Sequence, residues 1–365
     1  MIPPIASRIP LVRRPKAAGL PLADRIAHLT ELTVEPTGAS QHDLVARASG
    51  VLNYAALIAS DVGMPDLAAQ LCWRQHRAFA KAGSLTGDIA VMALMPLVNI
   101  ARLLIREGDG EGAYDVLRRL YRAAQQRGTA EIRSHNVDLS ALLGTEADHR
   151  KVCEELWVTM LIDGARALAR IGRWTEAAET MAAHRGIGNR LLDGRQIMIM
   201  SLMERGLSQQ ARAAIESTAP TEPWENAIAA LLRIYCRPAT SPTPQPELEL
   251  VLREALTLIT PPDPATAAFQ VRLGLVTLDL TRDRTGPCPA LLQDAIVDVA
   301  ILDAYAARDV LNHHLARSRL TSEQRQKLND VLTASGLGAG KLSPTHMHVL
   351  TTAVDEADVA LRRLL

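Results

Sequence analysis

Apolar residues recur at intervals of three and four positions along most of the chain, the spacing that forms one face of an α-helix. Ile100, Leu103 and Leu104 follow this spacing within the stretch 88–107, and other long stretches repeat it. We find no segment of four to eight residues with the alternation of apolar and polar positions that is typical of a half-buried strand. Aromatic residues make up only 3% of the chain, whereas alanine and leucine are abundant, and this composition favours helices. The pattern predicts an all-α fold.

Proline-rich stretches divide this helical pattern. The pattern extends over 41–237, stops at the sequence PATSPTPQP in 238–246, and resumes in 247–365. We therefore expect a repeat domain, a linker, and a C-terminal helical extension or capping domain. Residues 1–40 begin with a basic, proline-rich stretch, and prolines this dense prevent a helix. A flexible segment is predicted there, with a basic docking arm as the alternative.

One local motif occurs four times: a glycine is followed five residues later by an alanine, between two helical stretches. A glycine ends a helix in a left-handed turn, and a small alanine side chain lets the second helix approach the first. Four helical hairpins are therefore predicted. The pairs are Gly63–Ala68, Gly108–Ala113, Gly172–Ala177 and Gly206–Ala211; small or apolar residues precede each glycine by seven positions (Ala56, Ala101, Ala165, Ile199) and apolar residues follow it by nine (Cys72, Leu117, Met181, Ile215).

The third and fourth glycines, Gly172 and Gly206, are 34 residues apart, which is the period of a tetratricopeptide repeat. The region 41–237 resembles tetratricopeptide-repeat proteins, with Gly172–Ala183 as the best match. The resemblance implies a right-handed α-α superhelix, in which successive hairpins stack into a solenoid.

Two further segments, 184–196 and 221–225, are similar to the repeat region of actinobacterial proteins in which the repeats follow a helix-turn-helix DNA-binding domain. Only about forty residues precede the first hairpin here, which is too few for that domain. The resemblance therefore implies a bacterial sensor or adaptor that lacks the DNA-binding half.

The sequence contains no recognised catalytic or metal-binding motif. Ser335–Leu342 is glycine-rich, but it lacks the first glycine of a phosphate-binding loop and has Leu342 where Ser or Thr is needed. We therefore expect a turn at the end of a helix there. The histidines at 313–314 and 346–348 lack the spacing of metal ligands. Carboxylates beside Cys153 would raise the pKa of its thiol rather than activate it as a nucleophile. Taken together, these segments give no reason to expect a cofactor or a metal.

Forty basic and forty acidic side chains give a formal net charge of zero. Proteins that bind nucleic acids or anionic membranes usually carry a basic excess, so we expect neither as a direct partner. Four cysteines without close pairs argue against a disulfide-framed secreted protein. The sequence has no uninterrupted apolar run of about 18 residues, which argues against a membrane-spanning helix. A cytoplasmic protein is expected.

In the tetratricopeptide-repeat family, the side chains nine, six and two residues before the turn glycine face the ligand in a concave groove. A guanidinium binds carboxylates or phosphates through paired donors, and an asparagine amide satisfies both polar groups of a peptide unit. Arginines near helix ends also complement the helix dipole, which is the alternative explanation for them. The candidate ligand-binding residues are Asn99, Arg102, Arg106, Asp163, Arg166 and Arg170, together with Arg195 at the start of the fourth hairpin.

These observations favour a protein- or peptide-binding adaptor or sensor over an enzyme. Its ligand would be a peptide or protein segment, for instance an anionic one, held in the groove. The C-terminal helices would extend or cap the stack, or form a self-association surface in a homodimer. Two alternatives stay open: an enzyme or accessory protein of peptide natural-product biosynthesis, and a regulator that acts through protein contacts.

Overall fold

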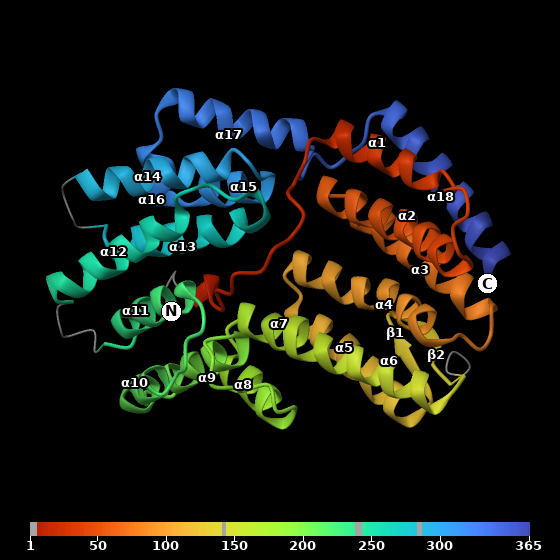
Figure 1. Ribbon diagram of the computed structural model, residues 1–365, viewed down its shortest axis with the longest axis horizontal. Helices are drawn as coiled ribbons and strands as arrows, with labels where there is room; N and C mark the ends of the chain where they lie inside the picture. Colours follow the sequence, from red (N-terminus) through yellow and green to blue (C-terminus); the bar gives the residue numbers. More distant parts are fainter. Residues whose placement is uncertain (1–5, 141–143, 238–242, 283–286) are drawn as a thin grey trace. The chain divides into compact units, whose positions relative to one another are not determined.

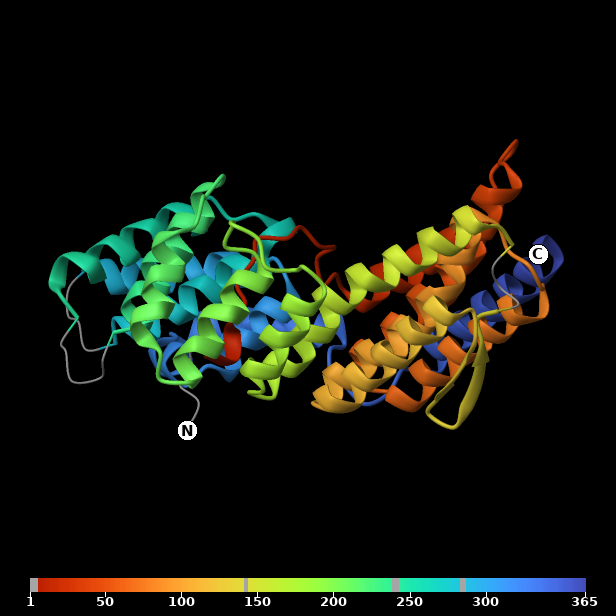
Figure 2. The ribbon, with the colours of Figure 1, turned by 90° about the horizontal axis from the view of Figure 1, so that it is seen from below.

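The computed structural model describes residues 6–140, 144–237, 243–282 and 287–365. About 74% of the chain is helical, which confirms the all-α prediction. Within the described residues the only sheet is one antiparallel hairpin, formed by β1 (Thr129–Ile132) and β2 (His135–Asp138), with Thr129 opposite Asp138. Figure 2 shows this hairpin, which lies against α5 (Gly110–Gln126). Each strand is four residues long, and β1 alternates exposed and buried positions, so the sequence carried a short strand signal here that the search for alternation missed.

The chain forms two compact units, and each is built from two separate segments (Figure 1). Unit 1 combines the described residues up to Leu20 with Leu168–Ser335, and unit 2 combines Pro21–Ala167 with Gly336–Leu365. This division differs from the expected one into 41–237 and 247–365, because both ends of the chain join a unit that is distant in sequence. The boundary after residue 167 falls inside a helix rather than in a linker.

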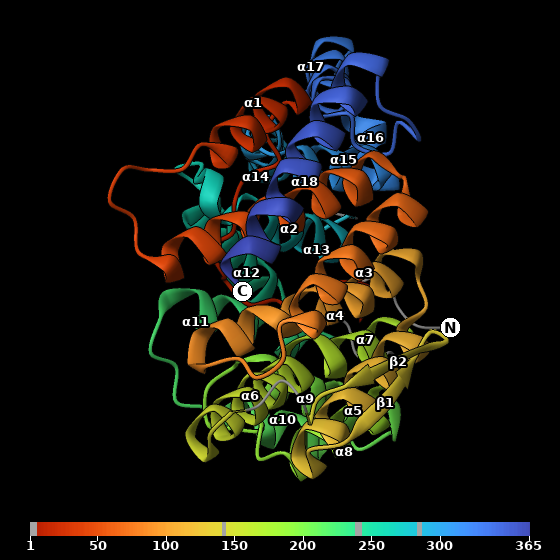
Figure 3. The same cartoon turned by 90° about the vertical axis from the view of Figure 1, so that its right-hand side faces the viewer.

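In unit 2, successive helices pack against one another in chain order from α1 to α6, and the C-terminal helix α18 packs against α1, α2 and α3 (Figure 3). The C-terminal helix thus covers the first hairpin, whereas the sequence predicted that the whole of 247–365 would extend or cap one stack. The elements are α1 (Leu22–Thr33), α2 (Gln41–Val62), α3 (Pro65–Lys81), α4 (Gly87–Glu107), α5, the β-hairpin, α6 (Glu146–Thr159), the π-helical turn η2 (Met160–Gly164), the first part of α7 (Ala165–Arg170), and α18 (Pro344–Leu364).

Unit 1 holds the remaining helices, and its core surrounds α13, which is buried on nearly all sides. The predicted linker 238–246 lies largely outside the described residues, and Gln245 already begins a helix. The elements are η1 (Ala6–Arg8), the end of α7, α8 (Trp174–Ala183), α9 (Asp193–Glu204), α10 (Ser208–Glu216), α11 (Pro223–Tyr235), α12 (Gln245–Ile259), η3 (Pro264–Thr266), α13 (Ala267–Leu280), α14 (Pro287–Ala300), α15 (Ala304–Asn312), α16 (His314–Arg319) and α17 (Ser322–Ser335).

Each predicted glycine stands between two helices in the left-handed conformation, with φ between 74° and 90°. The alanine five residues later is fully buried in all four cases, as are the flanking positions. The local hairpin prediction therefore agrees with the structure, because a left-handed turn and a close helix pair are set by residues near in sequence. The glycines are Gly63, Gly108, Gly172 and Gly206, and the alanines are Ala68, Ala113, Ala177 and Ala211.

The N-terminal segment is the part of the chain that differs most from the prediction. Instead of a flexible segment over 1–40, residues 6–20 lie against unit 1, with Ile9 and Leu11 buried, and α1 belongs to unit 2. The proline argument against an α-helix holds for 9–20, which has no regular secondary structure. The absence of a helix does not make this segment flexible, because the rest of unit 1 binds its backbone and side chains.

The glycine-rich segment Ser335–Leu342 forms the expected turn after α17, where Gly336 is left-handed. Its amides also bind the end of α2: Gly338 N donates to Asp61 O at 2.8 Å, and Gly340 N donates to Val62 O at 2.6 Å. These amides are therefore used to satisfy carbonyl groups at a helix C-terminus.

Among the described helices, only α4 is long and apolar enough to cross a membrane by the measures of length and composition. In this structure 56% of its most apolar window is buried inside the protein. Its buried side chains include Leu97, Ala101 and Leu104, which belong to the core of unit 2.

Candidate functional site

Three of the candidate residues, Asn99, Arg102 and Arg106, line a hollow of about 200 Å³ in unit 2, between α2 and α4. We call it the α2–α4 groove. Both helices are the first helices of their hairpins. Its lining consists of Asn53, Ala56, Leu57 and Ser60 from α2, Cys72 from α3, and Asn99, Arg102, Leu103 and Arg106 from α4.

A chain of polar contacts crosses one side of the groove. Asn99 Nδ2 donates to Asn53 Oδ1, and Arg102 Nη1 donates to Asn99 Oδ1 at 3.3 Å. Arg102 Nε and Nη2 are each 3.0 Å from Asp163 Oδ2. The amides and the guanidinium are therefore held in one orientation before any ligand arrives, while 44% of the Arg102 side chain remains exposed.

Asp163 lies in the π-helical turn η2, where Ala165 N bonds to Met160 O instead of the carbonyl four residues back. Such a turn adds a residue to the helix and re-aims the side chains near it. Here it accompanies the ion pair between Asp163 and Arg102, two residues that are far apart in sequence.

A buried carboxylate anchors the other side of the groove. Arg106 Nη1 donates to Asp61 Oδ1 at 2.6 Å and to Ser60 Oγ at 2.7 Å. Arg25 Nη2, from α1, donates to Asp61 Oδ2 at 2.8 Å. The Asp61 side chain is 1% exposed and that of Arg106 is 40% exposed. One buried carboxylate thus contacts two guanidiniums, and that of Arg106 lies on the solvent side.

The apolar part of the groove has no reactive thiol. Cys72 is almost fully buried, and burial raises the pKa of its thiol to about 12. The thiol is therefore protonated at neutral pH and behaves as a small apolar side chain.

Four of the seven candidate residues therefore meet at this groove: Asn99, Arg102 and Arg106 line it, and Asp163 binds Arg102. Arg166 and Arg170 lie on α7 and do not line the hollow. Arg195 belongs to unit 1, where its Nε donates to Ala214 O at 3.2 Å and its guanidinium also bonds to Ser217 Oγ. These bonds tie α9 to the end of α10, in a different unit from the hollow.

Sequence reasoning missed Asn53 and Arg25. Asn53 is ten residues before Gly63, one position away from the family's ligand-facing place, so a wider window would have found it. Arg25 gave no signal, because its helix lies in the segment that was predicted to be flexible.

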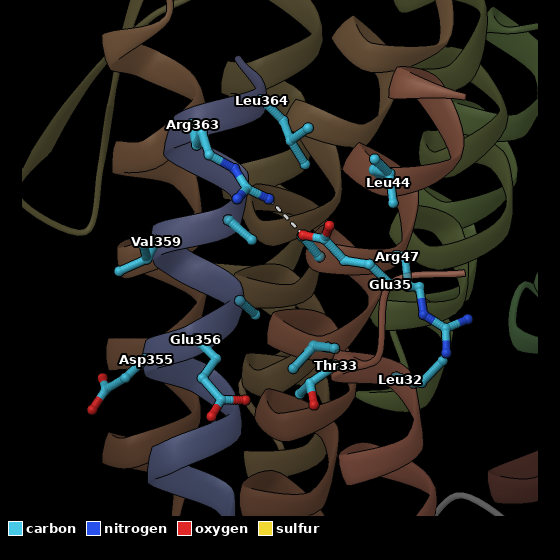
Figure 4. A pocket seen from close by; sticks show the side chains of 14 residues that line it. Leu32, Thr33, Glu35, Leu44, Arg47, Asp355, Glu356, Val359, Arg363 and Leu364 are labelled. Atoms are coloured by element: carbon cyan, nitrogen blue, oxygen red, sulfur yellow. Dashed lines mark hydrogen bonds and ion pairs between the residues drawn. The ribbon is translucent and has the colours of Figure 1, made fainter. Parts of the chain in front are cut away.

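A second hollow, of about 510 Å³, lies between α1, α2 and α18 (Figure 4). Leu32, Leu44 and Leu364 contribute to its apolar wall. At its mouth, Arg363 Nη2 donates to Glu35 Oε1 at 2.5 Å, and Figure 4 shows this pair reaching across from α18 to the segment after α1. The sequence analysis singled out none of these residues, because the position of α18 follows from long-range packing.

A third hollow, of about 650 Å³, lies between α3, α18 and the β-hairpin, beside the stacked rings of Trp73 and His135. The ring centroids are 3.9 Å apart. His76 lies next to Trp73, and burial lowers the pKa of its imidazole to about 4. This histidine is therefore neutral at physiological pH.

The remaining residues considered for chemistry have structural contacts. Cys153 Sγ is 3.4 Å from His149 Nε2, but that nitrogen is also 2.8 Å from Ala124 O, to which it must donate its proton. It is therefore not a base for the thiol, and burial raises the pKa of Cys153. His313 Nδ1 accepts the Ala316 amide at 3.1 Å and caps α16.

Among the residues that the structure describes, no group of three or more His, Cys, Asp and Glu side chains is arranged to hold a metal ion. Comparison with known proteins adds no assignment to this site. No protein-family model, no curated protein and no solved structure matches the chain.

Proposed function

We propose that the chain is a tetratricopeptide-like helical-repeat protein that binds a peptide, or an extended segment of a partner protein, in the α2–α4 groove. One observation carries the proposal: equivalent faces of two successive first helices line one hollow and present two amides and two guanidiniums to it. The four glycine-turn hairpins with their buried alanines support the repeat architecture.

The groove combines main-chain and side-chain recognition. The amides of Asn53 and Asn99 are already oriented by their mutual hydrogen bond, and each keeps further donor or acceptor capacity for a peptide unit. Arg102 and Arg106 stand four residues apart on one face of α4, and both are about two-fifths exposed. Because two-fifths of the Arg106 side chain is exposed, its guanidinium remains accessible to an anionic group of the ligand.

The size of the groove favours a segment over a complete cofactor. Pockets for drug-sized molecules measure about 300–1,000 Å³, whereas this hollow measures about 200 Å³. Leu57 and Leu103 add apolar wall, and Leu57 is 36% exposed. The hollow therefore suits one ligand side chain or chain end, with the rest of the ligand lying outside it.

A display library of short random peptides tests the proposal. The full chain and its variants are immobilised, and bound peptides are identified by sequencing after several rounds of selection. The groove variant combines Asn99→Ala, Arg102→Gln and Arg106→Gln, which remove contacts without adding a negative charge beside Asp163. We expect peptides with acidic residues to be enriched on the wild-type chain and lost on the groove variant.

The matched control combines Arg118→Gln and Arg119→Gln, since these exposed arginines of α5 also pair with an aspartate, Asp115. The control should select the same peptides as the wild-type chain. Equal enrichment on all three proteins, or no enrichment on the wild-type chain, would refute the assignment of the groove. Circular dichroism of each variant establishes that the helices are retained.

A further inference from the structure

Residues 6–20, which we call the strap, lie against unit 1 in the manner of a bound peptide. After the short turn η1 the strap has no regular secondary structure, and the buried side chains of Ala6, Ile9 and Leu11 anchor its first half. From residue 12 onward no side chain of the strap is fully buried. The second half is therefore held by polar contacts.

A buried glutamine recognises the main chain of the strap. Gln196 Oε1 accepts the Leu11 amide at 2.8 Å, and Gln196 Nε2 donates to Leu11 O at 2.8 Å and to Leu191 O at 2.7 Å. The Gln196 side chain is fully buried, so an unfilled site would leave its amide without the two bonds to Leu11 and with only the bond to Leu191 O. Both contacts are to backbone atoms, and any extended residue at this position can make them.

Aspartates of unit 1 meet each basic residue of the strap. The strap has four basic residues and no acidic one. Opposite charges along a bound segment select against other sequences, because an acidic residue at the same place is repelled. The pairs are Arg8 with Asp279 at 3.4 Å, Arg13 with Asp263 at 3.5 Å, Arg14 with Asp193, and Lys16 with Asp303 at 4.0 Å.

The far end of the strap is bound by its backbone and admits only a small residue. Lys16 N donates to Ala265 O at 2.9 Å, and Gly19 N donates to Asp303 Oδ2 at 2.8 Å. A Cβ at Gly19 would stand 3.2 Å from atoms of Ala304 and Tyr305. The site thus binds the extended main chain at two places, pairs with the basic side chains along the strap, and has room only for a small residue at the position of Gly19.

We propose that the surface under the strap is a recognition site for an extended, basic, proline-containing segment of a partner protein, and that the strap is its built-in competitor. Charge complementarity and the buried Gln196 argue for a segment of this chemistry. The strap is held by three buried apolar side chains and by ion pairs in which its own basic side chains are between 20% and 44% exposed. Ion pairs with a partly exposed partner contribute little, so we infer that the strap can leave the site without unfolding unit 1.

A labelled synthetic peptide with the sequence of residues 6–20 tests this proposal on the full chain by fluorescence polarisation. The strap variant Leu11→Asp with Arg14→Glu weakens the covalent competitor and leaves the site intact. Because an attached segment competes at a high effective concentration, we expect this variant to bind the peptide about ten-fold more tightly than the wild-type chain. Adding Gln196→Ala should abolish that binding.

The matched control is Arg253→Glu, an exposed charge reversal on α12, which should bind the peptide no more tightly than the wild-type chain. The proposal is overturned if the strap variant gains no affinity, or if Gln196→Ala has no effect on the gain. Light scattering distinguishes a segment of another protein from a segment of a second copy of this chain. If the wild-type chain is a dimer and the strap substitutions make it monomeric, the site binds a second copy, and the proposal of a different partner protein is overturned.

Hydrogen exchange of the wild-type chain tests the proposal without any substitution that endangers folding. The amides of Leu11, Lys16 and Gly19 should exchange about ten-fold faster than those in the middle of α9, because the strap opens by itself. Equal rates for the strap and α9 would mean that the strap leaves only when unit 1 unfolds, and would overturn the proposal.

Discussion

The carboxylate of Asp61 offers the sharpest test of how the α2–α4 groove is held. Asp61→Asn keeps the size of the side chain but removes the negative charge that faces Arg25 and Arg106. The Arg25–Asp61 contact, at 2.8 Å, is buried on both sides, with exposed fractions of 6% and 1%. Breaking such a pair costs roughly 3–5 kcal/mol. The Arg106 contact is 40% exposed on the arginine side and adds up to about 1 kcal/mol.

Asparagine can still accept one hydrogen bond from Arg25, so the expected loss in the free energy of unfolding is about 3 kcal/mol. Urea denaturation followed by circular dichroism measures this loss. The matched control is Asp115→Asn, since Asp115 also contacts two arginines but is 34% exposed. It should cost less than about 1 kcal/mol. Equal losses for the two variants would refute the reasoning that burial makes Asp61 the anchor.

Three further outcomes are expected. His76 has a pKa of about 4 in the folded chain and 6.5 when unfolded, so its contribution to stability is complete above pH 6.5 and lost as the pH falls toward 4. The stability advantage of the wild-type chain over His76→Gln should shrink by about 3 kcal/mol between pH 7 and pH 4, and an unchanged advantage would contradict this. Gly63→Ala forces a side chain into φ 90° and should cost about 1–2 kcal/mol. Gly50→Ala, in the interior of α2 with open space around it, should instead stabilise by about 0.5–1 kcal/mol; the same sign for both glycines in urea denaturation would contradict the turn assignment. Gly19→Ala should speed amide exchange at Gly19 and Lys16 in the wild-type background, and unchanged exchange would mean that the close approach to Ala304 has no role in holding the strap.

The hairpins were predictable because their determinants are local. Gly63 and Ala68 are five residues apart, and the left-handed turn and the close helix contact both follow from this pair. The same holds for Asn99, Arg102 and Arg106, which lie on one face of α4 because they are three and four residues apart. Local spacing thus identified three of the nine residues that line the hollow.

The remainder depends on contacts between residues that are far apart in sequence. Arg14 and Asp193 are 179 residues apart, so composition alone described the strap as a flexible basic segment. The packing of α18 against α2 was likewise not predictable, because the apolar spacing within a helix does not say which other helix it contacts. The contact of Arg195 with Ala214 at the end of α10 was not predictable either, because it depends on how α9 and α10 pack.

Native mass spectrometry of the full chain, gently purified from the organism that produces it, shows whether the α2–α4 groove holds a peptide. We expect a peptide or partner segment to copurify with the wild-type chain and with the Arg118→Gln, Arg119→Gln control. The same species should be missing from the groove variant with Asn99→Ala, Arg102→Gln and Arg106→Gln. A bare wild-type chain, or a bound species that the groove variant retains in full, would contradict the assignment of the α2–α4 groove as a peptide-binding site.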